Sequence, residues 1–262
     1  MLMKIAGQTL VANKLLAALP DVESQRVQKN LEPVTLRFGE VLYEPGDRIK
    51  YVYFPSDVLV SLLTLVDRHL ALEVGMVGWE GMVGVSCALG VGVTPFRALV
   101  QGTGTALRME AESFRKEFQS GHCLQREVHL YTHRLMAQLA QTGACNRFHF
   151  IEARLARWLL MTRDRVNSDH FHLTHEFLGD MLGVRRVGVT KAAHALKQRD
   201  LIDYSRGNMT VVDGPGLEAA ACSCYAVDKA SYEFPQKRLG NGIAVAEPGT
   251  SDAHKRENEH PG

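Results

Sequence analysis

The chain has 262 residues and a mass of 29.1 kDa, a length that suits one large domain or two modest ones. Hydrophobic residues make up 45% and charged residues 23%, which excludes a mostly disordered chain and a small disulfide-dependent protein. The net charge of +1 hides a gradient, because residues 146–213 carry 11 basic and 8 acidic side chains. The chain has neither a long apolar run nor a signal-like start. We therefore expect no membrane segment and a cytoplasmic protein.

Residues 30–110 predict an antiparallel sandwich or barrel. Glu44-Pro45-Gly46-Asp47 is a strong turn signal, with proline at the second position and glycine at the third. Several short β-prone runs at close spacing surround this turn, as is typical of such folds. These runs are residues 34–38, 41–43, 51–54, 58–65, 71–77, 96–100 and 105–109.

Residues 123–144 predict a long helix. Its apolar positions recur at intervals of three and four residues, close to the 3.5-residue period of a coiled-coil seam. The seam positions are Leu124, Val128, Tyr131, Leu135, Leu139 and Thr142. The pattern fits two alternatives, which are packing on the chain's own domain and pairing with a second copy.

Residues 148–166 predict a second helix, and the segment after it predicts a helix-turn-helix. Thr174 is a good N-cap for a short helix through residue 182, and Gly183 supplies a turn that needs a left-handed backbone. A helix over residues 185–198 follows, which is the order of a helix-turn-helix motif. We expect it to bury Val189, Ala192, Ala193 and Leu196.

The second helix of this motif is basic, with no acid between its cations. Arg185 and Arg186 lie in its first turn, where a cation opposes the helix dipole but where a reading helix presents side chains to base edges. The other cations of this stretch are Lys191, Lys197 and Arg199. Two β-prone runs then flank Ser205-Arg206-Gly207-Asn208. The Gly-Asn turn between them predicts a hairpin, or wing, with Arg206 at its tip near a DNA phosphate.

In this order of elements the chain resembles the Crp/Fnr family of bacterial transcription regulators over about residues 13–225. The motifs that carry the resemblance are Asn13-Lys14-Leu15-Leu16-Ala17-Ala18-Leu19-Pro20, Val41-Leu42-Tyr43-Glu44-Pro45-Gly46-Asp47, Val52-Tyr53-Phe54-Pro55, Gly78-Trp79-Glu80-Gly81-Met82-Val83-Gly84, Arg154-Leu155-Ala156-Arg157-Trp158-Leu159-Leu160 and the helix-turn-helix through Arg186.

The resemblance implies an α+β chain of three parts. These are an N-terminal antiparallel effector β-roll like cyclic-nucleotide-binding domains (13–118), a long dimerisation helix (119–145) and a winged helix-turn-helix (146–225). The tail from Ser231 is rich in proline, glycine and charge, which predicts disorder over residues 233–262. The resemblance further implies a homodimer that binds double-stranded DNA and works with RNA polymerase, and it favours self-pairing through the six seam positions.

The resemblance also assigns the DNA contacts. Arg186 matches the family arginine that contacts a guanine, whereas Val187 stands where relatives often carry a base-reading glutamate. We therefore expect a different half-site. The candidate DNA-binding residues are Thr174, Arg185, Arg186, Gly188, Thr190, Lys191 and Arg206.

The candidate effector pocket departs from the cyclic-nucleotide pattern. Met82 replaces the carboxylate that holds a ribose, and Arg97 lacks a hydroxyl neighbour, which makes a poor phosphate clamp. We expect a different small effector or none, and no cofactor. The pocket candidates are Gly81, Met82, Val83, Gly84, Arg97 and Ala98.

Other chemistries find little support in the sequence. Cys222-Ser223-Cys224 lacks the spacing of a zinc pair, and the five cysteines are expected to be reduced, with no metal site. No third ligand accompanies His129 and His133, and we place His170, His172 and His175 on a loop. No catalytic motif is present, and Glu73 and Glu80 are expected at the surface or in turns. The remaining alternatives are an effector-independent DNA-binding dimer and a ligand-sensing module without a role in transcription.

Overall fold

The computed structural model describes residues 2–5, 8–11, 13–66 and 70–233. Residues 2–232 within these ranges belong to one compact unit, which begins with the strands β1 (Leu2–Ile5) and β2 (Gln8–Val11). Two short helices follow, α1 (Lys14–Ala17) and α2 (Asp21–Gln28). The predicted disordered tail lies outside the described residues except for Glu233, which ends a helix.

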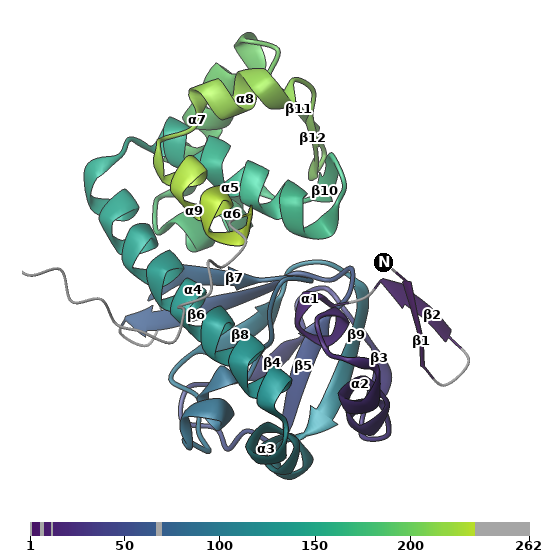
Figure 1. The fold of residues 1–262 in the computed structure, drawn as a ribbon. Helices are drawn as coiled ribbons and strands as arrows, with labels where there is room; N and C mark the ends of the chain where they lie inside the picture. The colour runs from purple at the N-terminus through teal and green to yellow at the C-terminus, as the bar shows by residue number, and fades with distance from the viewer. Residues whose placement is uncertain (1, 6–7, 12, 67–69, 234–262) are drawn as a thin grey trace, which may run out of the picture. The chain divides into compact units, whose positions relative to one another are not determined.

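Two antiparallel sheets form the β-roll, as the sequence predicts (Figure 1). The first has the order β3-β9-β5, and the second has the order β4-β8-β6-β7. All seven strands coincide closely with predicted runs, because each is a short run of β-prone residues next to turn signals. Their bounds are Glu32–Leu36 (β3), Val41–Tyr43 (β4), Tyr51–Pro55 (β5), Val60–Val66 (β6), Leu70–Val77 (β7), Arg97–Val100 (β8) and Gly104–Glu110 (β9).

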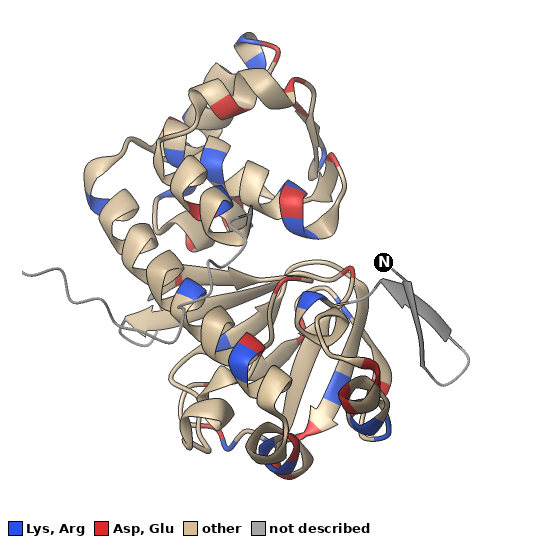
Figure 2. Ribbon diagram, viewed as in Figure 1, with Lys and Arg blue, Asp and Glu red and all other residues tan. Residues whose placement is uncertain are grey.

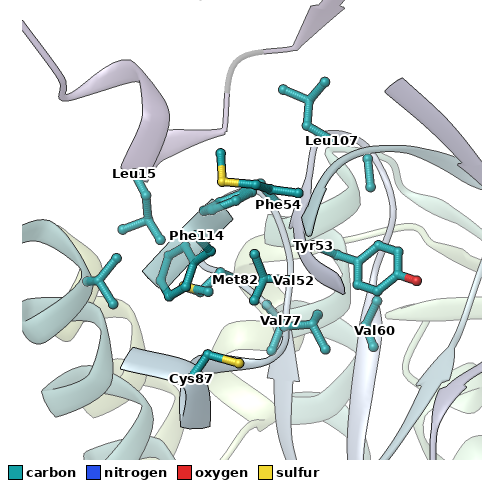
Figure 3. Packing of buried hydrophobic residues seen from close by; sticks show 14 of the residues in the cluster. Leu15, Val52, Tyr53, Phe54, Val60, Val77, Met82, Cys87, Leu107 and Phe114 are labelled. Carbon is teal, nitrogen blue, oxygen red and sulfur yellow. The ribbon is translucent and has the colours of Figure 1, made fainter. Parts of the chain in front are cut away.

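A buried apolar cluster fills the roll. Val52, Phe54, Phe114 and Met82 are each 1% exposed or less and belong to this cluster (Figure 3). A 3₁₀ turn, η1 (Val85–Leu89), and the helix α3 (Ala111–Ser120) pack against each other beside it.

The long helix α4 (His122–Phe148) leads to the C-terminal helices (Figure 1). Gly75 of β7 allows a close approach here, because a Cβ at this position would lie 3.2 Å from a methyl carbon of Leu139. The remaining helices are α5 (Ile151–Val166), α6 (His175–Leu182), α7 (Arg186–Gln198), α8 (Gly214–Ala220) and α9 (Cys224–Glu233). The helices α8 and α9 were not foreseen. Within the described ranges, no helix combines the length and the apolar character that a membrane span needs.

A second buried cluster joins the C-terminal helices to the β-roll. It contains Trp158 and Leu159 of α5 together with Leu59, Leu63 and Met76 of the roll. Two polar contacts cross the same boundary, from the Trp158 indole and the Arg165 guanidinium to buried carboxylates of the roll. The C-terminal part is therefore held to the roll by apolar packing and by buried polar contacts.

Candidate nucleic-acid interface

Two short helices, α6 and α7, meet at a tight turn. The Thr174 hydroxyl accepts a hydrogen bond from the backbone N–H of Phe177 (3.1 Å) and caps the start of α6. The turn is made by Gly183, whose φ of 63° lies in the left-handed region. A Cβ at Gly179 would lie 2.9 Å from the carbonyl oxygen of Val184, so this close approach requires glycine. The structure confirms the predicted helix-turn-helix.

The helix α7 has one buried and one exposed face. The four predicted residues, Val189, Ala192, Ala193 and Leu196, are each at most 4% exposed and lie in the second cluster. The opposite face carries the exposed residues Arg186, Val187, Thr190, Lys191 and His194, and Gly188 is half-buried. Buried small residues let α7 pack closely on α5 while its other side faces solvent.

The cations at the C-terminal end of α7 are paired within the chain. Lys197 forms an ion pair with Asp203 (2.5 Å), and Arg199 forms one with Glu152 (3.0 Å). This hydrogen-bonded pairing raises the pKa of Lys197. Both groups serve the local structure, so the five cations of this stretch are not equivalent.

The cations at the N-terminal end of α7 differ. Within the described residues, Arg185, Arg186 and Lys191 have no carboxylate oxygen within 4.0 Å of their nitrogens. Arg185 is the N-cap residue and makes no capping hydrogen bond through its side chain. Positive charge at a helix N-terminus opposes the helix dipole, so these arginines do not contribute helix stability. They present uncompensated guanidinium groups to solvent, and the surrounding charges can be followed in Figure 2.

Thr190 connects α7 to α6. Its hydroxyl donates to the carbonyl oxygen of Arg186 (3.1 Å), and its oxygen lies 3.1 Å from Nδ1 of His175. The hydroxyl proton is already used, so His175 fits here as the neutral tautomer with a proton on Nδ1. Burial first, and the charge of Arg186 second, lower the pKa of His175. Thr190 therefore positions α7 through its internal hydrogen bonds.

The wing is a three-stranded antiparallel sheet with the order β10-β12-β11. Its strands are β10 (His170–His172), β11 (Ile202–Ser205) and β12 (Asn208–Val211). Arg206 (φ 49°) and Gly207 (φ 82°) make the turn, which is therefore centred one residue earlier than the predicted Gly-Asn pair. The predicted hairpin is confirmed, with Arg206 exposed at its tip.

The expected histidine loop is wrong. His170 and His172 lie on β10, where their ring nitrogens contact Thr210 (3.0 Å) and Asn208 (3.1 Å) of the neighbouring strand. His175 is the first residue of α6. A three-residue strand gives too little pattern for prediction, since pairing with β12 creates it.

The comparisons with known proteins agree with this geometry. Residues 153–220 match the model of a protein family described as the Crp-like helix-turn-helix domain. This part of the chain therefore carries a domain of that family, and the rest of the chain shares its fold with the solved structures that follow. One similar solved structure is a Crp/Fnr-family regulator from Eubacterium rectale, with 15% identity, a TM-score of 0.61 and coverage of 79% of this chain and 96% of the other. FixK2 from Bradyrhizobium japonicum is 14% identical, with a TM-score of 0.63 and coverage of 73% of this chain and 98% of the other. The c-di-GMP-responsive regulator CLP from Xanthomonas campestris is 12% identical, with a TM-score of 0.60 and coverage of 73% of this chain and 99% of the other. No curated protein matches the sequence.

The residues predicted for the effector pocket all have contacts within the β-roll itself. Met82 and Val83 are each 1% exposed and belong to the core of the roll, and Ala98 is equally buried. A Cβ at Gly81 would lie 2.2 Å from the ring of Tyr131, so this ring fills the space beside the glycine.

The other two pocket candidates also have internal roles. Gly84 has a φ of 94° and supports the turn into η1. Arg97 pairs with Glu44 at 2.9 Å. The protein's own side chains therefore occupy the contacts that the sequence assigned to an effector, because the apolar residue 82 belongs to the core.

The predicted dimer seam of α4 is also wrong. Leu124, Val128, Tyr131 and Leu135 are each at most 5% exposed and lie in the core of the β-roll. The other two seam residues point the same way, because Leu139 packs on this cluster and Thr142 accepts a hydrogen bond from Arg157 (3.1 Å). These residues instead follow the alternative of packing on the chain's own domain. The pattern did not separate the two, because a helix packed on a sheet shows nearly the same apolar period as a helix in a coiled coil.

The two carboxylates expected at the surface or in turns are both buried. Glu73 accepts hydrogen bonds from the Trp158 indole (2.8 Å) and the Ser61 hydroxyl (2.6 Å). Glu80 accepts a hydrogen bond from the Gly78 backbone N–H (3.2 Å) and pairs with Arg165 (2.8 Å). Its predicted role in a turn is therefore confirmed, whereas a surface location is wrong. Their partners on α5 lie 85 residues away in the sequence.

Sequence reasoning missed one cluster entirely. Cys145 and His149 at the end of α4 lie beside Cys222 and Cys224, with all four candidate ligand atoms within 4.8 Å of one another. The signal was present, because Cys145 and His149 are one helical turn apart. It was overlooked because Cys222 is 77 residues from Cys145.

Proposed function

We propose that this chain is a sequence-specific DNA-binding transcription regulator that acts as a homodimer on a near-palindromic site. The observation that carries the proposal is the exposed N-terminal end of α7, where Arg185, Arg186 and Lys191 have no carboxylate partners among the described residues. The second helix of a helix-turn-helix lies in the major groove with its N-terminal residues at the base edges.

The proposed division of work follows from side-chain chemistry. Arg186 reads a guanine through a bidentate contact to O6 and N7. Val187, which is 59% exposed, offers an apolar surface that suits the methyl group of thymine and cannot accept from cytosine. Arg185, Lys191 and Arg206 bind phosphates, which positions the protein without specifying sequence.

Two residues of the predicted DNA-binding set act indirectly in this proposal. Thr174 holds the N-terminus of α6, and Thr190 joins α7 to His175. Gly188 is half-buried, and a Cβ at this position would lie 3.4 Å from a methyl carbon of Ile151, so it faces α5. Removing either threonine is expected to affect DNA binding through the position of α7.

The proposed dimer forms through the outward face of α4, since the inward seam is used by the chain's own core. Exposed residues recur on this face at intervals of four and three. They are His129, His133, Met136, Ala140, Gly143 and Arg147. Met136 and Phe148 are 63% and 75% exposed, and the adjacent small residues Ala137 and Ala144 allow a second α4 to approach closely. A second copy therefore fits this face.

The filled interior of the β-roll favours the version of this function that needs no cyclic nucleotide. Tyr131 and Met82 occupy the region where a ribose carboxylate would stand. The regulator CLP, by its description, responds to c-di-GMP, so effector chemistry differs among proteins with this fold. We infer that no cofactor binds in the roll. We also infer that RNA polymerase contacts the DNA-bound dimer at a surface outside the interior of the roll.

Selection of bound sites from a random duplex pool, at a stated salt concentration, tests the proposed function. The proposal predicts a two-fold symmetric motif with half-sites roughly 34 Å apart. The matched control is Arg186→Ala, which should enrich a degenerate motif. Recovery of no motif by the wild-type protein, both alone and with cell extract added, would contradict the proposal and favour a ligand-sensing module.

A further inference from the structure

Four candidate ligand side chains converge where α4 ends and α9 begins. Cys145 lies in the last turn of α4, and His149 is the C-cap residue of that helix. Cys222 lies between α8 and α9, and Cys224 is the first residue of α9. The Cys145 and Cys222 sulfurs are 3.5 Å apart, and the Cys224 sulfur is 3.5 Å from Nδ1 of His149. All four ligand atoms lie within 4.8 Å of one another.

These distances are those of a single tetrahedral ion. With metal–sulfur bonds of ~2.3 Å and metal–nitrogen bonds of ~2.0–2.1 Å, the edges of a tetrahedron measure roughly 3.5–3.8 Å. The contacts between Cys145 and Cys222 and between Cys224 and His149, both 3.5 Å, match such an edge. An iron–sulfur cluster of several irons would hold its four protein ligands farther apart than one ion does.

The local backbone explains why the four atoms converge. The backbone N–H of His149 donates to the carbonyl of Cys145 (3.1 Å), which closes one helical turn and brings both side chains to the same side of α4. The backbone N–H of Tyr225 donates to the carbonyl of Cys222 (3.0 Å), so this turn holds Cys222 beside Cys224. The two pairs are thus each fixed by a local turn.

The environment suits thiolate ligands. The three sulfurs are buried, with Cys145 and Cys224 1% exposed and Cys222 8% exposed. Nε2 of Gln141 donates to the Cys224 sulfur (2.9 Å), the kind of hydrogen bond that supports a ligand from outside the metal shell.

The charges also balance. Three thiolates and one divalent cation carry a net charge of −1, which a neighbouring cation must offset in a buried site. Arg157 is neutralised by Asp228 (2.5 Å), so it adds little net charge. Arg154 is buried and lines the same cavity as Cys145, so its guanidinium can supply the offsetting charge.

We propose that Cys145, His149, Cys222 and Cys224 bind one divalent ion of the zinc class in a tetrahedral site with three sulfur ligands and one nitrogen ligand. Four protein ligands leave no open position, so the site is structural and closed. It ties the end of α4 to the start of α9, beside the connection from α4 to α5. This inference concerns the folded chain alone and does not depend on DNA binding.

Metal analysis of the full-length protein, purified under reducing conditions, tests the proposal. We expect about one zinc per chain by mass spectrometry of the elements. Replacement by cobalt should give the strong visible absorption of tetrahedral Co²⁺ and a thiolate charge-transfer band in the near ultraviolet. The variants Cys145→Ser and Cys222→Ser should lose most of the metal, whereas the control Cys123→Ser, outside the cluster, should retain it.

A ligand exchange keeps the test valid if the serine variants do not fold. His149→Cys retains four ligands, so it should still bind one ion, and its cobalt spectrum should shift toward that of a four-thiolate site. Three results would overturn the proposal. These are wild-type protein that takes up neither zinc nor cobalt after reduction, stoichiometric iron in place of zinc, and a Cys145–Cys222 disulfide in protein that stays metal-free when reduced.

Discussion

Replacing Glu73 by glutamine should change how the stability of the protein depends on pH. Glu73 is 6% exposed, and burial raises the pKa of its carboxyl from 4.5 to about 7, although three hydrogen-bond donors oppose this shift. An acid whose pKa is higher in the folded state favours folding while it is protonated. This stability is fully present below about pH 4.5 and is lost as the pH rises through about 7.

The magnitude follows from the size of the shift. Each pKa unit corresponds to about 1.4 kcal/mol, so moving from pH 5 to pH 8 should remove about 2.5 kcal/mol from the contribution of Glu73. Gln101 provides the acceptor that a protonated Glu73 needs. Its buried Oε1 has no hydrogen-bond partner among the residues that the structure describes, and turning the amide over would place this oxygen beside Glu73.

Urea unfolding of the wild type and of Glu73→Gln at pH 5 and pH 8 measures this effect. Glutamine stays neutral, so the free energy of unfolding of the variant should rise relative to the wild type by about 2.5 kcal/mol between the two pH values. The control Glu112→Gln, at an exposed carboxylate on α3, should show no comparable change. A difference between wild type and Glu73→Gln that stays constant with pH would refute the reasoning.

Two further predictions concern stability and assembly. Glu80→Gln leaves the buried charge of Arg165 unpaired and should cost about 3–5 kcal/mol in urea unfolding. The control Glu44→Gln, at a partly exposed pair, should cost less than about 1 kcal/mol, and equal losses would contradict this account. Ala140→Glu, on the outward face of α4, should shift the protein to a monomer in sedimentation while it stays folded, and Leu135→Glu should instead unfold it, because Leu135 is 5% exposed in the core. A dimer unchanged by Ala140→Glu would exclude this face.

The parts of the fold that local sequence determines were predictable. The turn at Gly183, the N-cap Thr174 and the buried face of α7 each follow from neighbouring residues within a few positions. The same is true of the seven strands of the roll, because a short β-prone run marks each of them. Strand β10 was missed because its three residues form a strand only through pairing with β12.

The errors share one physical origin, which is that periodicity and spacing do not identify a partner. The seam through Leu124 and Leu135 has the period of a helix that packs on something, and in this fold that neighbour is the β-roll. Cys145 contacts Cys222, which is 77 residues away in the sequence. Glu73 and Glu80 find theirs 85 residues away on α5. Such long-range contacts leave no local pattern, so their side chains looked like surface or terminal residues.

The most direct test of the central claim, that α7 reads DNA through Arg186, is a binding titration on the duplex recovered by selection. The wild type, Arg186→Ala and Arg199→Ala are compared on this site and on an unrelated duplex of equal length. Because Arg199 is paired with Glu152, Arg199→Ala is the matched control. We predict that Arg186→Ala weakens binding to the selected site by roughly 5–150-fold, about 1–3 kcal/mol. The ratio of its affinities for the selected and the unrelated duplex should also fall, while both affinities of Arg199→Ala should stay near those of the wild type. Wild-type affinity and preference in Arg186→Ala would contradict the account.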